Sequence, residues 1–247
     1  MTLKVLWNTR IKNKFPDLRI SALILSNVTI IETPIDIINQ IEQLYFSQIK
    51  EIFNLENLKN NIQVRAYRDF YWSIDIDPTK TRPASEALVR RILANKPLWR
   101  INSFVDSYNI ASAVTLITLG AYDLNSIQEE TENIDLNIRM SKTDEEFQGI
   151  GMKESKLLKG KELIVESNNK IICIYPYRDA YFSRIRNQTK KILLLAYGVP
   201  QISSISLKES LELTIKIYKN FDKTFQSSDI QLFVPKKEDM FQHYKKK

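Results

Sequence analysis

The stretch TRPASEALVRRILANKPLWRINSFVDSYNIASAVTLITLGAYD, residues 81–123, predicts two helices around which the rest of the chain is organised. Pro83 stands at a favourable first helical position, and apolar side chains recur every four residues after it. These apolar residues are Ala84, Leu88 and Ile92. Their spacing predicts a short amphipathic helix over residues 83–93.

The second predicted helix carries an unusual polar face. Its apolar stripe consists of Ile101, Val105 and Tyr108. Three short polar residues, spaced by four and three, share another face: Asn102, Asp106 and Asn109. Asn and Asp are poor helix formers, so a binding role would account for their presence. Purely structural roles are equally open, with Asn102 as the helix cap and Asp106 as a solvated residue.

Short motifs continue along the chain in a characteristic order. They are Arg82-Pro83-Ala84-Ser85-Glu86-Ala87, Arg100-Ile101-Asn102, Val105-Asp106, Tyr108-Asn109, Gly120-Ala121-Tyr122-Asp123, Asp135-Leu136-Asn137-Ile138-Arg139, Glu145-Glu146-Phe147, and Tyr175-Pro176-Tyr177-Arg178-Asp179 followed by Thr189. This order resembles the B3/B4 editing domain of the phenylalanyl-tRNA synthetase beta subunit. It is still more similar to the freestanding proteins built from that domain alone. The likeness covers about residues 65–225.

The resemblance implies an α/β fold with a single B3/B4-like domain. We expect a mixed sheet covered by helices and a second small sheet of short strands. The domain is expected over residues 61–226, with a strand and helix from residues 1–60 packed on it. Residues 227–247 are rich in lysine and are expected to form a flexible basic tail.

The few reactive side chains limit the chemistry. The chain has one cysteine and one histidine, and His243 lies in the lysine-rich tail, so a His-based triad or a nitrogen and sulfur metal site is not expected. The resemblance implies a reaction that needs neither, which is hydrolysis of the ester joining a wrong amino acid to the terminal ribose of tRNA. No metal or cofactor is expected.

The same resemblance suggests roles for particular residues. Glu86 or Asp179 would bind the ammonium group of the amino acid or orient the attacking water. The expected substrate-binding residues are Arg82, Ser85, Asn102, Asp106, Asn109, Arg139 and Arg178. For each charged residue, an ion pair within the protein is the competing interpretation. The expected partner is the aminoacylated 3′ end of tRNA, with no DNA and no membrane involved.

Two departures from the synthetase pattern leave the amino acid open. The synthetase-borne domain has a histidine where this chain has Gly120. Its glutamate that reads a tyrosine hydroxyl would fall near Phe182 or Arg184, and neither is acidic. A noncatalytic RNA-binding module and a small-molecule-binding protein therefore remain as alternatives to a deacylase.

Composition is compatible with these expectations. The 247 residues are 43% hydrophobic and 26% charged, with a formal net charge of +7, which suits a polyanionic partner without requiring one. Residues 1–10 lack the apolar core of a signal peptide, so a cytoplasmic location is expected. Cys173 lies in an apolar run and is expected to be buried.

The remaining elements are predicted from local patterns. The expected elements are a strand at 19–31, helices at 34–53 and 62–71, a strand at 136–140, a hairpin at 162–175, a strand at 190–197 and a helix at 206–221. Thr33 and Ser206 are the predicted caps of the first and last of these helices. In the second, arginines alternate with aromatics, which suits either base stacking or packing in the core.

Overall fold

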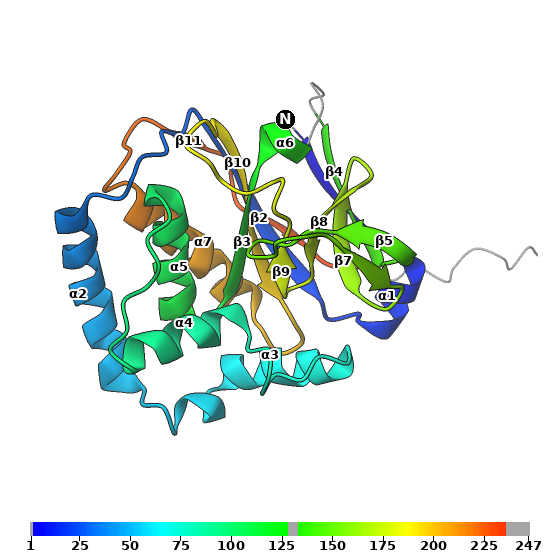
Figure 1. Cartoon of the computed structure of the whole chain (residues 1–247), viewed down its shortest axis with the longest axis horizontal. Coiled ribbons are helices and arrows are strands. Elements are labelled where there is room, and N and C mark those ends of the chain that lie inside the picture. The colour runs from blue at the N-terminus through cyan, green and yellow to red at the C-terminus, as the bar shows by residue number, and fades with distance from the viewer. Residues whose placement is uncertain (1, 128–132, 236–247) are drawn as a thin grey trace, which may run out of the picture.

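The computed structural model describes residues 2–127 and 133–235 (Figure 1). Its helices are α1 (Thr9–Lys14), α2 (Ile35–Ile52), α3 (Ile62–Ser73), α4 (Ala84–Leu93), α5 (Ser103–Thr115), α6 (Leu124–Ile127) and α7 (Ser204–Tyr218), with a 3-10 turn at Leu58–Asn60. Its strands are β1 (Thr2–Trp7), β2 (Arg19–Ser26), β3 (Thr118–Asp123), β4 (Asn133–Met140), β5 (Thr143–Phe147), β6 (Lys156–Lys159), β7 (Leu163–Ser167), β8 (Lys170–Ile174), β9 (Arg178–Asp179), β10 (Lys191–Gly198), β11 (Gln226–Ser227) and β12 (Gln231–Phe233).

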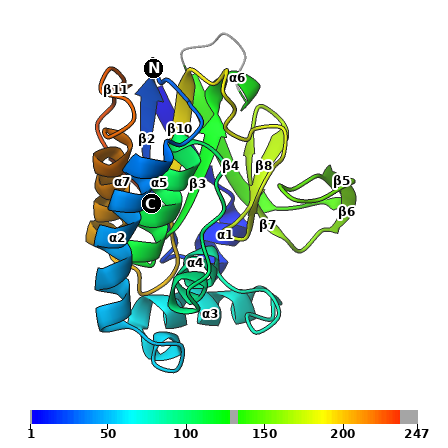
Figure 2. The ribbon, with the colours of Figure 1, turned by 60° about the vertical axis from the view of Figure 1, so that its left-hand side comes forward.

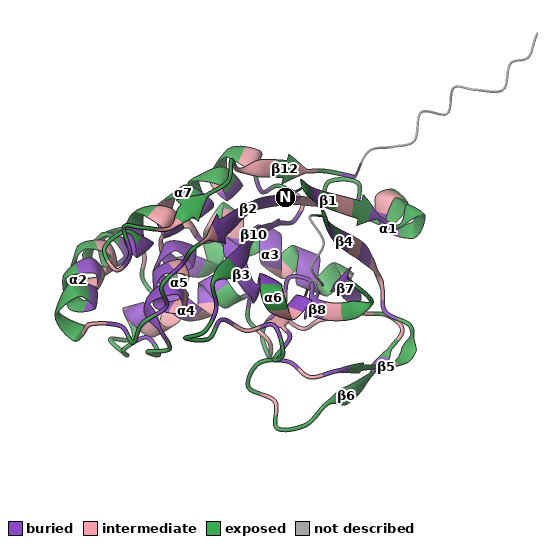
Figure 3. Ribbon diagram, turned by 90° about the horizontal axis from the view of Figure 1, so that it is seen from above, coloured by how far each residue is buried: buried purple, intermediate pink, exposed green. Residues whose placement is uncertain are grey.

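An antiparallel sheet forms the middle layer. Its strand order is β11-β2-β10-β3, and β12 also pairs with β2. The register places Leu193 of β10 between Ile24 of β2 and Tyr122 of β3. Helices α5 and α7 pack on one face, and the other sheet lies on the opposite side (Figure 2). Because both faces are covered, β10 is buried at every position after Lys191 (Figure 3).

The second sheet has the order β1-β4-β7-β8-β9. It is mixed, because β1 runs parallel to β4 while the other neighbours are antiparallel. A two-stranded sheet, β5-β6, projects from it. The expected α/β class with a small additional sheet is therefore confirmed. The helices, however, cover the antiparallel sheet rather than the mixed one.

Both ends of the described chain are integrated into these sheets. The N-terminal strand β1 pairs with β4, and β2 lies inside the middle sheet between β10 and the two C-terminal strands. Residues 227–233 belong to the expected tail, yet residue 227 completes β11 and residues 231–233 form β12. The prediction of a flexible tail was wrong for these residues, because their backbone completes the outer side of β2. Residues 236–247 lie outside the described part.

Two predicted helix caps were wrong. Helix α2 begins after Pro34, while the hydroxyl of Thr33 donates instead to Asp106 at 2.6 Å. Helix α7 is capped by Ser203, which accepts from the backbone N–H of Ser206, so the helix begins earlier than expected. Both differences arise because a polar side chain near a helix start has more than one possible partner.

Helix α3 supports the packing interpretation of its aromatics. Tyr67, Phe70 and Tyr71 are buried, whereas Trp72 is 56% exposed. The Tyr67 hydroxyl donates to the carbonyl of Tyr197 and accepts from the N–H of Thr118 at 3.1 Å. These contacts join α3 to the middle sheet, so three of the four aromatics are occupied in the core.

Candidate functional site

A chain of polar side chains connects the two large sheets. Asp179 lies in β9, and its carboxylate accepts a hydrogen bond from the hydroxyl of Tyr122 in β3. The Tyr122 hydroxyl also contacts that of Tyr197 in β10. Cys173 in β8 completes the group, with its Sγ 3.2 Å from the Tyr197 hydroxyl. The group therefore contains one carboxyl, two phenols and one thiol at the boundary between the sheets.

The environment of this group raises each pKa. Burial raises the pKa of Asp179 to about 7, although the hydrogen bond from Tyr122 lowers it in part. Burial also raises the pKa of Cys173 to about 12, and that of Tyr122 well above its ordinary value. Near neutral pH the phenols and the thiol are protonated, while Asp179 exchanges between its two forms. An acid that titrates near the working pH is suited to proton transfer.

Gly120 provides the space for this arrangement. A Cβ at this position would lie 2.6 Å from the Tyr122 hydroxyl and 3.0 Å from a carboxylate oxygen of Asp179. It would also lie 2.9 Å from the ring of Tyr197. Ordinary side chains do not fit at these distances, so glycine is required for the Tyr122–Asp179 contact as it stands.

Helix α5 brings one phenol within electrostatic reach of this group and carries a half-buried amide at the next position. The Tyr108 phenol has its pKa raised first by burial and then by the charges of Asp179 and Asp106, which places it within their electrostatic reach. Asn109 follows in the helix and is half-buried. Within the described residues its amide makes no hydrogen bond to the protein, so it retains capacity for a ligand.

Two predicted binding residues of α5 have structural contacts. Asn102 caps the helix, because its side-chain oxygen accepts from the N–H of Val105 at 3.0 Å. Asp106 accepts from Thr33 and, at 3.0 Å, from the N–H of Ile101. Burial raises the pKa of Asp106, and these two hydrogen bonds oppose the rise. The cap interpretation of Asn102 is thus confirmed, and Asp106 is buried rather than solvated.

Glu86 is held in a buried ion-pair network of its own. Its carboxylate accepts from Arg68 at 2.8 and 2.7 Å and from Arg90 at 2.7 Å. Burial alone would raise its pKa, but the two arginines lower it below the ordinary value. A carboxylate neutralised in this way is a poor base, so Glu86 is a weaker candidate for proton transfer than Asp179.

The predicted arginines lie in different environments. Arg139 forms a closed network with Glu145, at 2.9 and 2.7 Å, and with Glu166. Arg178 donates to the carbonyl of Ile150 at 3.1 Å and lies over the ring of Tyr177. Both are therefore engaged within the protein.

The remaining predicted binding residues adjoin the start of α4. Arg82 is exposed and makes no ion pair among the described residues. The Ser85 hydroxyl is buried and has no hydrogen-bond partner in the same part of the chain. They do not join the Asp179 group through any direct hydrogen bond in the described structure.

Comparison with known proteins identifies the family. A model of the B3/4 domain matches residues 66–244. The chain belongs to the B3/4 domain family. It is similar to the phenylalanine--tRNA ligase beta subunit of Malacoplasma penetrans, with 26% identity over 157 residues, which cover 61% of this chain and 19% of that protein. The expected resemblance is therefore confirmed.

A solved structure is also similar to this B3/4 domain. It is an N-terminal fragment of the phenylalanyl-tRNA synthetase beta subunit from Pyrococcus horikoshii, with 10% identity and a TM-score of 0.45. The match covers 92% of this chain and 50% of that fragment. The chain thus spans less than two thirds of the length of either relative.

The B3/4 match begins within α3, at residue 66. Two strands of the fold therefore precede it, since β1 belongs to the mixed sheet and β2 to the antiparallel one. Within the match, sequence reasoning selected Asp179 but did not select Tyr122 or Tyr197. The signal available for Tyr122 was Gly120, which precedes it by two residues in a buried strand. Residues two apart lie on the same face of a strand, so the glycine leaves space beside the tyrosine.

The described residues contain no cluster of three His, Cys, Asp or Glu that could hold a metal ion. No described helix has both the length and the apolar character needed to cross a bilayer.

Proposed function

We propose that this B3/4-domain chain is a trans-acting deacylase that hydrolyses the ester of mischarged aminoacyl-tRNA. The observation that carries the proposal is the Asp179 carboxyl, which titrates near neutral pH beside Gly120 and holds a donor from Tyr122. Such a group can act as a general base at physiological pH. The relationship to phenylalanyl-tRNA synthetase beta subunits supports a substrate of this class.

The proposed reaction needs no covalent intermediate with the protein. The Asp179 carboxylate takes a proton from a water molecule while the water oxygen attacks the ester carbonyl. The bond between the carbonyl carbon and the ribose oxygen then breaks, and that oxygen takes the proton back from Asp179, which returns to its carboxylate form. The products are a free amino acid and a tRNA with a free terminal hydroxyl. Positioning of the water supplies much of the acceleration, because the ester is already activated.

Other residues would hold the substrate. Asn109 has a free amide for the amino acid or the terminal adenosine, and Arg82 has a free guanidinium for phosphate, as judged within the described residues. Ser85 is a further candidate contact, since its hydroxyl lacks a partner in the described structure. Four of the predicted binding residues already make contacts within the protein, so in this proposal they stabilise the structure of the site. They are Asn102, Asp106, Arg139 and Arg178.

The decisive experiment is incubation of the full chain with a panel of mischarged tRNAs, followed by measurement of released amino acid. Asp179→Asn should abolish the activity found, whereas Asp75→Asn, an exposed carboxylate outside the polar group, should leave it unchanged. Asn109→Ala should reduce the rate mainly through KM. Unchanged rates in both Asp179→Asn and Asn109→Ala would remove these residues from the site.

The second candidate is a noncatalytic module that binds RNA. It is favoured by the internal partners of Glu86 and Arg139, because these leave few charged groups for chemistry. If no tRNA in the panel is hydrolysed above buffer but tRNA binding falls steeply with salt, this candidate is preferred. Absence of salt-dependent binding as well would favour a small-molecule ligand.

A further inference from the structure

The contacts around Asp179 fix which atom donates to which. An ionised carboxylate has no proton, so the Tyr122 hydroxyl donates to the Oδ1 atom of Asp179. A phenol has a single proton, and that of Tyr122 is then in use. In its contact with Tyr122, the Tyr197 hydroxyl is therefore the donor. By the same count, the Cys173 thiol donates in its 3.2 Å contact with the Tyr197 hydroxyl.

These three bonds run in one direction, from Cys173 through Tyr197 and Tyr122 to Asp179. We call Cys173, Tyr197 and Tyr122 the donor row. Its members come from β8, β10 and β3, and none is more than 2% exposed, so water does not compete for their protons. Hydrogen bonds aligned head to tail polarise one another in such surroundings, and each one strengthens the next.

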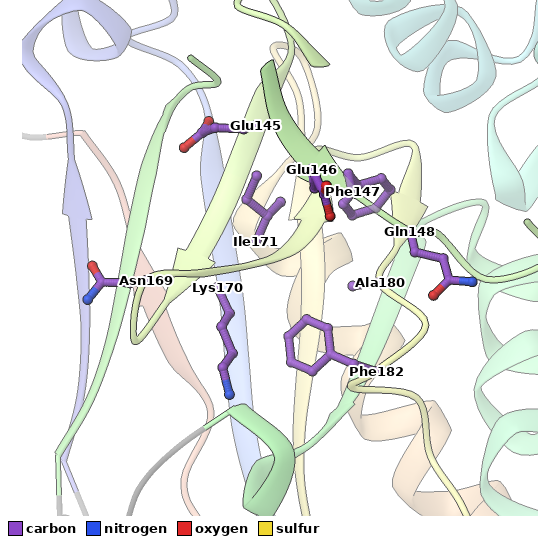
Figure 4. Close-up of a pocket in the computed structure, with 9 residues that line it drawn as sticks. All are labelled: Glu145, Glu146, Phe147, Gln148, Asn169, Lys170, Ile171, Ala180 and Phe182. Atoms are coloured by element: carbon purple, nitrogen blue, oxygen red, sulfur yellow. The ribbon is translucent and has the colours of Figure 1, made fainter. Parts of the chain in front are cut away.

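The strand geometry directs Asp179 toward the donor row. Asp179 of β9 is paired with Cys173 of β8, and paired residues lie on the same face of a sheet. The next residue, Ala180, points to the other face, where Figure 4 shows it in the wall of a pocket of about 350 Å³. The Asp179 carboxyl therefore faces the antiparallel sheet and not this pocket.

Ionised Asp179 is stabilised by hydroxyl groups and not by an ion pair. Burial raises its pKa, and the hydrogen bond from Tyr122 opposes the rise. Its neighbour Arg178 donates to the Ile150 carbonyl instead. The groups that act on Asp179 from the strands and helix around it all have a raised pKa and are neutral near pH 7. They are Tyr122, Tyr197, Cys173 and, from α5, Tyr108, which also lies within reach of the charge of Asp106.

The donor row occupies one oxygen of the carboxylate. Tyr122 donates to Oδ1, while Oδ2 accepts no hydrogen bond from the described part of the chain. A base that takes a proton from water needs one oxygen available to that water and a fixed orientation of the carboxylate. The row supplies the orientation and leaves Oδ2 available.

We propose that Tyr197 is a positioning residue for Asp179, and that the ordered donation from Cys173 to Tyr197 to Tyr122 holds the ionised carboxylate with Oδ2 available to the attacking water. The inference rests on the proposed function, since it states how the base of that reaction is held. It assigns a role to two side chains, those of Tyr197 and Cys173, that touch neither the substrate nor the water.

The first test is titration of Asp179 by carboxyl-carbon NMR in the full chain. Tyr197→Phe should raise the pKa of Asp179 by about 0.5 unit, because loss of one bond weakens the next by a fraction of its strength. Cys173→Ala should cause a smaller rise, and Cys173→Ser, which retains a donor, should not. Tyr175→Phe is the matched control, because its buried hydroxyl donates to the Gly198 carbonyl outside the row.

The second test needs no variant and reads the far end of the row. Cys173 is the single cysteine of the chain, so the S–H stretching band in a vibrational spectrum is its own. The band should move to lower frequency as Asp179 ionises, because the thiol then donates into a row directed at a negative charge. Asp179→Asn and Tyr197→Phe should each abolish this pH dependence. A band that does not follow the Asp179 titration would overturn the proposal.

The kinetic signature separates positioning from a purely structural role. Tyr197→Phe should lower the deacylation rate only at pH values where Asp179 is partly protonated, with KM unchanged. A purely structural role would lower the rate at every pH, and that result would overturn the proposal. So would an Asp179 titration that is unchanged in folded Tyr197→Phe, or one that moves equally in Tyr175→Phe.

The outcome is distinguishable from failure of the deacylase proposal, because NMR and vibrational spectra do not depend on activity. If no ester is hydrolysed but the Asp179 titration and the S–H band respond as described, the donor row stands and the deacylase does not. If esters are hydrolysed through Asp179 while Tyr197→Phe changes neither titration nor pH profile, the deacylase stands and the positioning role does not. Thermal unfolding of each variant confirms that it is folded.

Discussion

The hydroxyl of Tyr122 donates to the carboxylate of Asp179, and this bond joins edge strand β3 of the antiparallel sheet to edge strand β9 of the mixed sheet. The two residues are 57 positions apart in the sequence. The same carboxyl has a pKa of about 7, so the contact between the sheets is also the place where the protein changes charge near neutral pH. Substitutions at this contact and at the buried carboxylate of Glu86 should therefore have measurable and different effects.

Tyr122→Phe should move the titration of Asp179 to higher pH. The Tyr122 hydrogen bond favours the charged carboxylate, so its removal raises the pKa of Asp179 further. A hydrogen bond to a charged group contributes about 1.5 to 3 kcal/mol, which corresponds to roughly one to two pH units. The acidic limb of the pH profile of deacylation should shift by this amount. Tyr218→Phe is the control, because that hydroxyl donates to the Thr29 carbonyl instead.

Asp179 should make the protein less stable as pH rises. Its folded-state pKa is raised above the ordinary value of 3.8, so its stabilising contribution is complete below about pH 4 and is lost as pH rises through about 7. The change is at most about 4 kcal/mol and is reduced by the partial exposure of the residue. Urea denaturation of wild type and Asp179→Asn between pH 4 and 8 measures it. The variant should gain stability relative to wild type with rising pH, and a constant difference would contradict the assignment.

Gly120→Ala should destabilise the protein by about 1 to 3 kcal/mol, because the new methyl group overpacks the polar group. The nearest atom it meets is the Tyr122 hydroxyl oxygen, at 2.6 Å. The penalty should therefore be smaller in a Tyr122→Phe background, which lacks that oxygen. A double-mutant cycle by urea denaturation checks this coupling. Equal penalties in both backgrounds would show that the clash lies elsewhere.

Glu86→Gln should lower the free energy of unfolding by about 3 kcal/mol while leaving the deacylation rate per folded molecule unchanged. The side chain is fully buried, and its loss leaves the charges of Arg68 and Arg90 without their partner. Glu42→Gln is the matched control, because its pair with Arg100 is partly exposed and should contribute less. A specific fall in rate without loss of stability would return Glu86 to the catalytic candidates.

Local sequence patterns predicted most helices of this fold and its longest strands, β2, β4 and β10. Helix α4 begins one residue after its predicted start at Pro83 and ends at Leu93 as expected, because its apolar spacing agrees with its packing. Strand β10 was predicted within one residue at each end for the same reason. The caps were less predictable, since Ser203 and Ser206 are equally suitable by type and only the course of the preceding loop decides between them.

The candidate site was predictable only in part. Asp179 could be selected from its motif, and Asn102 could be identified as a possible cap from its position. The role of Tyr122 was not evident, because a tyrosine in an apolar strand is ordinarily a core residue. Its partner is provided by another sheet, and strand periodicity carries no information on that pairing. The requirement for glycine at position 120 likewise depends on side chains from β9 and β10.

The position of β2 has a practical consequence for work on this domain. A fragment trimmed to the family match would begin at residue 66 and lack this strand, so one side of β10 would lose its backbone partners. Unpaired strand edges readily recruit strands from other molecules. Such a fragment should aggregate where the longer chain does not, and its inactivity would reveal nothing about the chemistry at Asp179.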